Sequence, residues 1–185
     1  MASAGKVLVH ACCAVCLEAI HGALVEEGWR VEVFFYNPNI HPYREFAKRL
    51  RAVEVSAESK KLPLTADKEY GLAEYLEKIL PAGEGRCRAC YELRLGRTAE
   101  AAAAGGFDAF TTTLLASPHQ KHEAVKAAGE GAAGHGVPFL YRDWRGRMEL
   151  GVREARRRSL YRQQYCGCIL SEYERFGPQS ERTGV

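Results

Sequence analysis

Short apolar runs alternate with amphipathic segments along this 185-residue chain, and the alternation constrains its fold more than any other feature. The apolar runs are rich in β-branched and aromatic residues and predict strands, whereas the segments between them have helical spacing. The predicted strands are 6–10, 31–36, 62–66, 108–115 and 137–142, and the predicted helices are 14–28, 43–60, 69–80, 87–104 and 118–133. This order predicts an α/β fold, with a Rossmann-like parallel sheet and helices on both faces.

A single domain is the expected organisation for a chain of this length. Hydrophobic residues at 46% and charged residues at 26% are globular values, which exclude a disordered or collagen-like chain. We expect an α/β core over 5–142, a basic helical segment over 143–176 and a polar, disordered tail over 177–185. The last core helix is expected to open with Ser117 as N-cap and Pro118 at its first position.

The sequence predicts a cytoplasmic protein with no membrane partner. The apolar stretch after Lys6 is interrupted by His10 and Glu18, whereas a signal peptide needs an unbroken apolar core. No run approaches the roughly 18 apolar residues of a transmembrane helix. Because disulfide frameworks are rare in reducing compartments, the seven cysteines indicate metal ligation or redox chemistry.

The loop after the first predicted strand indicates thiolate chemistry rather than phosphate binding. In parallel sheets, ligands bind beyond the carboxyl ends of the strands, and nucleotide-binding versions carry a glycine-rich loop at this point. Here the chain reads Cys12-Cys13-Ala14-Val15-Cys16, and this loop has no GxGxxG, Walker or Ser-Gly-Gly motif. We therefore expect no ATP.

The first two cysteine groups have the spacing of metal ligands. Cys13 and Cys16, like Cys87 and Cys90, are three positions apart at predicted helix starts, where both sulfurs can face one metal and thiolates are stabilised. The spacing allows zinc or an iron–sulfur cluster, and the long βαβ stretch between the pairs favours a cluster. Cys12 points away from Cys13 in an extended loop, which favours a second metal beside the first.

The third group, Cys166-Gly167-Cys168, is different. The glycine permits the tight backbone of a small-ring disulfide, and such a strained bond suits a redox relay. Two further metal ligands are the alternative. His10, directly before the first cysteines, and Tyr165, directly before the last pair, are the candidate catalytic proton donors by position.

The segment from residue 142 to 162 carries eight arginines against three acidic residues, with aromatic residues interleaved. This composition is typical of a nucleic-acid surface, in which arginines contact phosphates and aromatic rings stack on bases, although a solvated helix face has a similar pattern. The candidate RNA-binding residues are Arg145, Arg153, Arg156, Arg157, Arg158 and Arg162.

Four motifs in order resemble the epoxyqueuosine reductase QueH family: residues 10–16, 87–94, 110–120 and 160–168. The resemblance implies an oxidoreductase that reduces the epoxide of epoxyqueuosine in tRNA to queuosine, the last step of queuosine biosynthesis. The family acts on the wobble base of the anticodon without cobalamin, and its fold is related to the ATP-pyrophosphatase and HUP-type folds. It is associated with a [4Fe–4S] cluster and an additional iron beside it.

The resemblance implies that Cys12, Cys13, Cys16, Cys87 and Cys90 hold the metals, that Cys166 and Cys168 form a redox disulfide, and that an unidentified donor supplies electrons. Cys16 stands where some family members carry aspartate, and Val15 replaces a frequent proline. Two alternatives share the cysteines: a zinc- or cluster-containing tRNA sulfur-transfer enzyme, and a non-catalytic, metal-stabilised tRNA-binding module.

Overall fold

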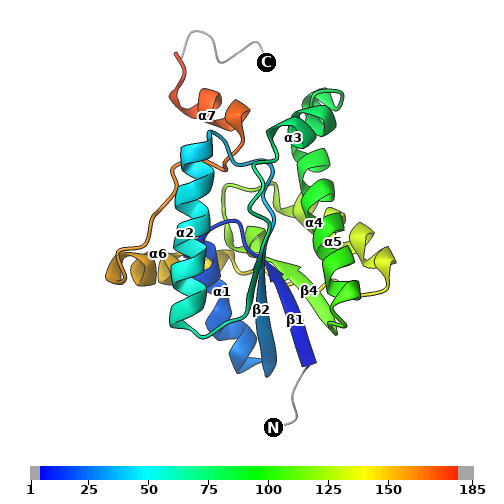
Figure 1. The fold of residues 1–185 in the computed structure, drawn as a ribbon, viewed down its shortest axis with the longest axis vertical. Coiled ribbons are helices and arrows are strands. Elements are labelled where there is room, and N and C mark those ends of the chain that lie inside the picture. The colour runs from blue at the N-terminus through cyan, green and yellow to red at the C-terminus, as the bar shows by residue number, and fades with distance from the viewer. Residues whose placement is uncertain (1–4, 179–185) are drawn as a thin grey trace.

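A computed structural model describes residues 5–178 and confirms the α/β fold with a parallel sheet (Figure 1). All strand pairs are parallel, and the strand order is β3-β2-β1-β4. The strands are β1 (Gly5–His10), β2 (Trp29–Phe35), β3 (Leu64–Ala66) and β4 (Ala109–Thr112). The carboxyl-terminal halves of β1 and β2 are buried on both faces, as a doubly covered sheet requires, with Val7, Leu8, Val9, Phe34 and Phe35 all buried.

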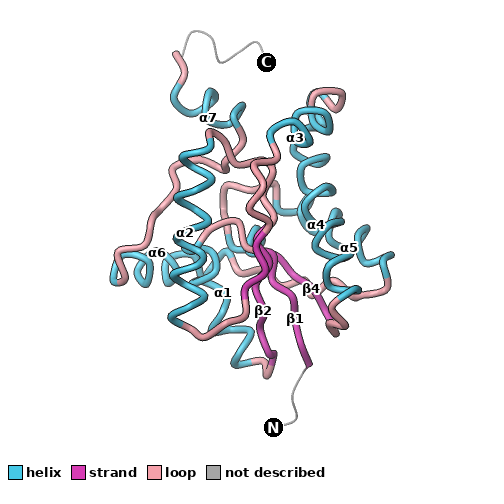
Figure 2. The backbone as a smooth tube through the Cα atoms, viewed as in Figure 1, coloured by secondary structure: helices cyan, strands magenta, loops and turns pink. Residues whose placement is uncertain are grey.

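Helices cover both faces of the sheet (Figures 1 and 2). On one face lie α1 (Ala14–Glu26) and α2 (Tyr43–Ser59); on the other lie α4 (Arg86–Ala104) and α5 (His122–Ala132). The short helix α3 (Leu72–Ile79) packs on α4 beyond the carboxyl ends of the strands. These ends meet at one edge of the sheet, which is where the cysteine-containing loop begins.

The basic C-terminal segment is partly helical, as predicted, with α6 (Met148–Arg157) and α7 (Ile169–Phe176). Helix α6 packs so closely on α1 that a Cβ atom at Gly151 would lie 2.4 Å from the carbonyl oxygen of Val15. Of the predicted polar tail, residues 179–185 lie outside the described residues. Within the described range, no helix has both the length and the apolar character needed to cross a membrane.

The predicted fifth strand, 137–142, is wrong. The described chain forms only one parallel bridge there, between Phe110 and Phe139. Two backbone hydrogen bonds flank it, from Phe110 N to Pro138 O (3.1 Å) and from Leu140 N to Phe110 O (2.8 Å). Pro138 has no N–H to donate to a neighbouring strand. The Leu140 carbonyl accepts a hydrogen bond from the Thr111 hydroxyl at 2.7 Å, where a longer strand pair would use a backbone donor.

The predicted start of α5 is also wrong, because the helix begins at His122 and not at Pro118. The Ser117 hydroxyl accepts a hydrogen bond from His119 N (3.3 Å), so it caps a turn that precedes the helix. Strand β4 is shorter than predicted, because the Thr112 side chain accepts from Leu114 N and starts a 3₁₀ turn. The described 3₁₀ turns are Gly83–Gly85, Thr113–Ala116, Ala133–His135 and Arg145–Arg147.

Candidate metal and redox site

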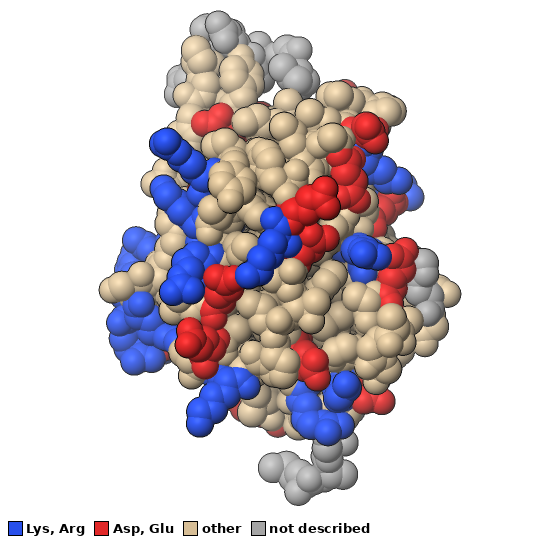
Figure 3. Space-filling view, in the orientation of Figure 1, with Lys and Arg blue, Asp and Glu red and all other residues tan. Residues whose placement is uncertain are grey.

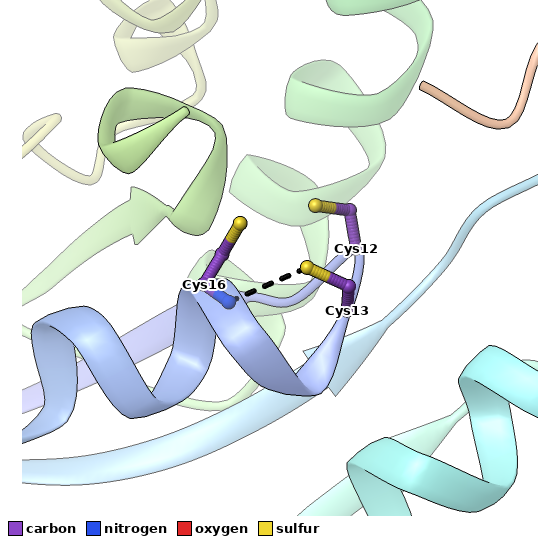
Figure 4. A group of neighbouring side chains, drawn as sticks. All are labelled: Cys12, Cys13 and Cys16. Atoms are coloured by element: carbon purple, nitrogen blue, oxygen red, sulfur yellow. Dashed lines mark hydrogen bonds between the residues drawn. The ribbon is translucent and has the colours of Figure 1, made fainter. Parts of the chain in front are cut away.

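The junction between β1 and α1 brings three cysteines together in the interior (Figure 4). The sulfur atoms of Cys12, Cys13 and Cys16 all lie within 4.8 Å of one another, and all three residues are buried. Cys13 is the N-cap of α1, and its sulfur accepts a hydrogen bond from the backbone N–H of Cys16 at 3.4 Å. We call these residues the cysteine triad.

The three thiols of the triad differ in pKa. Hydrogen bonds from Cys13 and Cys16 hold the pKa of the Cys12 thiol well below its usual range, against the opposing effect of burial. The same bonds raise the pKa of Cys13 to about 12 and raise that of Cys16. The Thr113 hydroxyl lies 3.4 Å from the Cys12 sulfur and supports its thiolate. Sulfur atoms bound to one tetrahedral metal lie about 3.8 Å apart, so this spacing suits thiolate ligation of a metal.

The other four cysteines form two pairs on two separate segments. Cys87 and Cys90 lie in the first two turns of α4, and Cys166 and Cys168 lie just before α7. Cys90 and Cys168 are buried in a small apolar cluster with Tyr75 and Ile79, and Cys166 packs against it. Among the described residues, only the triad has three such side chains within mutual ligand distance, so Cys87 and Cys90 lie outside that set.

Arg94 lies between the cysteine groups and is the residue that sequence patterns missed. Its side chain is buried; one Nη atom lies 4.0 Å from the Cys90 sulfur, and the other donates to Asn37 Oδ1 at 2.7 Å. Burial opposes the charge, but Cys90 and Cys12 outweigh it and raise the pKa of Arg94, with a smaller effect from Cys166. The guanidinium thus contacts Cys90, and Cys12 and Cys166 affect its pKa through their charge.

The Cys166–Cys168 pair is present as two thiols. A hydrogen bond from Cys168 lowers the pKa of Cys166 to about 7, and the Ser171 hydroxyl, 2.8 Å from the Cys166 sulfur, adds to this effect. The same bond and burial raise the pKa of Cys168. One member of the pair is therefore poised to react near neutral pH, while a redox disulfide between them stays a prediction.

A buried arginine holds the backbone of this pair. Arg49 is 1% exposed and forms an ion pair with Glu45, with 2.6 Å between Nε and Oε1. Its two Nη atoms donate to the carbonyl oxygens of Tyr165 and Cys166, each at 2.9 Å. A guanidinium presents several donors in one plane, and here they fix consecutive peptide groups of one loop.

The two candidate proton donors have different surroundings. His10 is completely buried; its Nε2 lies 3.1 Å from the Tyr36 carbonyl and its Nδ1 lies 2.8 Å from the Thr112 hydroxyl. Since a carbonyl only accepts, Nε2 carries the hydrogen, and burial lowers the pKa of His10 to about 3. Tyr165 is partly exposed, and its hydroxyl donates to the His41 carbonyl.

The six candidate RNA-binding arginines divide into two sets. Three form ion pairs: Arg145 with Asp143, Arg157 with Glu154 and Arg158 with Glu18. Three are exposed and form no side-chain ion pair within residues 5–178: Arg153, Arg156 and Arg162. The basic segment therefore carries less free charge than its composition suggests.

The segment that follows these arginines reaches the triad. The Gln163 side-chain amide donates to the Cys13 sulfur at 2.9 Å, although the two residues are far apart in sequence. The spacing of the cysteines in the sequence does not predict this contact. It places the loop between α6 and α7 directly over the triad.

Comparisons with known proteins agree with these features. A family model described as "Epoxyqueuosine reductase QueH" matches residues 7–174. A protein of that name from Dehalococcoides mccartyi is 42% identical over 175 residues, which cover 94% of this chain and 96% of the relative. Proteins of the same name from Thermotoga maritima and Acinetobacter baylyi are 36% and 32% identical, covering 92% and 91% of this chain and 92% and 81% of their own lengths. The predicted resemblance is confirmed, and the chain belongs to the epoxyqueuosine reductase QueH family.

Proposed function

We propose that this protein is an epoxyqueuosine reductase that converts epoxyqueuosine in tRNA to queuosine in the cytoplasm, without ATP or cobalamin. The observation that carries the proposal is the buried cysteine triad at the carboxyl end of β1, together with buried Arg94, which lies 4.0 Å from the Cys90 sulfur. Relatives named for this activity match nearly the whole chain. A cysteine loop replaces the phosphate loop that an ATP-dependent sulfur-transfer enzyme would need.

The reaction sets the number of electrons and protons that the site must supply. Reducing an epoxide to an alkene breaks two C–O bonds, releases the oxygen as water, and consumes two electrons and two protons. Oxidation of two thiols to one disulfide releases two electrons and two protons. The Cys166–Cys168 pair matches this demand, and an external electron donor returns the disulfide to thiols.

The metals proposed for the site are a [4Fe–4S] cluster and an adjacent iron, held by the cysteines of α1 and α4: Cys12, Cys13, Cys16, Cys87 and Cys90. The chemistry of the donor set fits, because these thiols lie at or near two helix N-termini, which favour thiolates. Within residues 5–178, the triad already lies within mutual ligand distance, and Cys87 and Cys90 would complete the set. When bound, such a cluster supplies single electrons at low potential, and an iron beside it serves as a Lewis acid.

The protein's own residues hold charge and protons around this site. The positive charge of Arg94 favours the thiolates of Cys12 and Cys90. Tyr165 is the better-placed of the two candidate proton donors, because it is partly exposed at the Cys166–Cys168 loop and, among the described residues, its hydroxyl has only one partner to leave, the His41 carbonyl. His10 acts as a positioning residue, because both of its ring nitrogens already join β1 to Tyr36 and Thr112.

The tRNA is proposed to bind through the basic segment next to the triad. Arg153, Arg156 and Arg162 are the members of the candidate set that are free to contact phosphates. The paired members Arg145, Arg157 and Arg158 contribute charge more weakly, since their acids offset it.

The test is a direct assay with anaerobically purified protein. We expect tRNA that carries epoxyqueuosine to yield queuosine when dithionite is the reductant, as measured by chromatography of the digested nucleosides. The Cys13→Ser variant is the matched negative control. Failure of iron-loaded wild-type protein to form queuosine would refute the proposed function.

A further inference from the structure

A groove lies between α2 and the segment that joins α6 to the cysteine loop. Its volume is about 460 Å³. Its floor is apolar and includes Ala52, Val55 and Leu160, and the Tyr161 ring lines it. The charged lining residues are all basic: Lys48, Arg51 and Arg158. A groove with an apolar floor, an aromatic wall and a positive rim matches the chemistry of a nucleotide, whose flat base is bonded to a charged phosphate.

The positive charge comes from α2, a helix that composition did not single out. Arg44, Lys48 and Arg51 are exposed at spacings of four and three residues, so they lie along one face of the helix. The Arg51 side chain is 72% exposed, and its contact with Glu54 is long, at 3.6 Å. In Figure 3, Lys and Arg side chains gather on the side of the molecule where α2 and α6 lie. This surface adds to the exposed arginines of α6.

The Tyr161 ring is fixed in place. Its hydroxyl donates to Glu45, which is itself held by the buried Arg49. The Lys48 ammonium lies 5.4 Å from the ring centroid. Because the phenol group is tied to the protein, the ring offers a rigid surface for stacking and loses little entropy on binding.

The segment that lines the groove leads along the chain to the cysteine triad. Tyr161 lines the groove, and Gln163, two residues later, donates to the Cys13 sulfur. Two residues span at most about 7 Å of backbone. A single RNA strand can therefore follow this segment from the groove to the triad.

We propose that this groove binds the unstacked base of a nucleotide next to the one that is reduced, with Tyr161 stacking on the base and Lys48 and Arg51 contacting the flanking phosphates. The inference rests on the proposed function, because it assigns part of the same tRNA to a second site. It predicts that binding requires a single-stranded loop, since a duplex keeps its bases stacked.

The test measures RNA affinity by fluorescence anisotropy, with an anticodon stem-loop hairpin and a duplex of equal length as probes. Tyr161→Leu is expected to weaken hairpin binding about tenfold and to leave duplex binding unchanged, since stacking is specific to an unpaired base. Tyr161→Phe keeps the ring but lacks the hydroxyl that ties it to Glu45, so it should lose much less hairpin affinity than Tyr161→Leu. The melting temperature of each variant shows whether it is folded.

The double variant Lys48→Gln with Arg51→Gln tests the phosphate contacts. Plotted as log affinity against log salt concentration, its slope should fall by roughly 1.4, because two contacts to a single strand are lost. Arg30→Gln is the matched control: Arg30 is exposed near the start of β2, at the opposite end of the sheet, and its loss should not change the slope.

Three results would overturn the inference. Wild-type affinity in both the Tyr161→Leu and the double variant would exclude the groove from RNA binding. Equal weakening of hairpin and duplex by Tyr161→Leu would exclude a stacked base. Conversion of a dimer to a monomer by the double variant, at unchanged RNA affinity, would make a second copy the occupant. The Cys13→Ser variant separates the two proposals, because it should lose reductase activity and keep hairpin affinity.

Discussion

The triad and the Cys166–Cys168 pair are both sulfur sites, but the protein supports them in different ways. The triad lies where a buried strand enters a helix, and α6 packs against that helix without room for a side chain at Gly151. The pair lies in a loop that is held through its carbonyl groups by Arg49. Regular elements fix ligands for a metal, whereas a loop held by hydrogen bonds can accommodate a change between dithiol and disulfide.

The largest expected effect is on metal content and separates the two sites directly. Cys13→Ser removes a proposed thiolate ligand, while serine can still cap α1, so we expect the anaerobically prepared variant to lose most of its iron. Cys168→Ser should keep the wild-type content, about four or more irons per chain if a [4Fe–4S] cluster is bound. Iron and acid-labile sulfide assays measure both. Equal iron loss in the two variants would mean that both sites hold metal.

The second prediction concerns the arginine that holds the loop. Arg49→Met leaves Glu45 as a buried charge and leaves two carbonyls without their donor, so we expect a loss of about 3–5 kcal/mol in the free energy of unfolding. Arg97→Met is the control; its pair with Glu100 is half exposed and should contribute less than about 0.5 kcal/mol. Urea unfolding of metal-free protein measures both, and similar losses would show that Arg49 does not support the loop.

The third prediction tests how tightly the loop is packed. Gly167 has φ +116°, and an added Cβ would lie 3.0 Å from Ile40 Cγ1 and 3.2 Å from Arg49 Nη1. Gly167→Ala should therefore cost about 1–3 kcal/mol in unfolding free energy. Gly22→Ala in α1 is the control, because nothing lies near its Cβ and alanine favours a helix, so this variant should be slightly more stable. An unaffected Gly167→Ala would mean that the loop can shift at little cost.

Sequence patterns predicted the triad site better than the contacts around the loop. Cys13 and Cys16 come together because their spacing is local and a helix start fixes it. The approach of Cys166 to Cys90 depends on how α7 and α4 meet, and spacing carries no information about that. Buried arginines also escape patterns that place charge at the surface. For Arg94, the sequence offered one indication: it follows Cys90 by four residues, so the two side chains lie on the same face of a helix.

The errors in the fold also have local causes. The apolar run at 137–142 has the composition of a strand, but Pro138 lacks a backbone donor and the Thr111 hydroxyl donates to the Leu140 carbonyl. The motif Ser117-Pro118 has the composition of a helix start, but it forms a turn four residues earlier than α5. In both cases side-chain hydrogen bonds compete with the regular element that composition favours.

The smallest expected effect is on the reactivity of Cys166, and it tests whether the loop already activates one thiol. With a pKa of about 7, Cys166 is mostly protonated at pH 5.5, half ionised near pH 7 and fully ionised above about pH 8.5, so its alkylation rate should rise through neutrality and then level off. At pH 7 we expect a rate only a few-fold above that of an ordinary thiol, because a thiolate of lower pKa is also a weaker nucleophile.

Mass spectrometry of metal-free protein treated with iodoacetamide measures the alkylation rate of Cys166. In Ser171→Ala, which lacks one hydrogen bond to the Cys166 sulfur, the midpoint should move to higher pH. A wild-type midpoint above pH 8.5 would show that the loop leaves Cys166 an ordinary thiol, and the contrast with the triad would then rest on metal content alone.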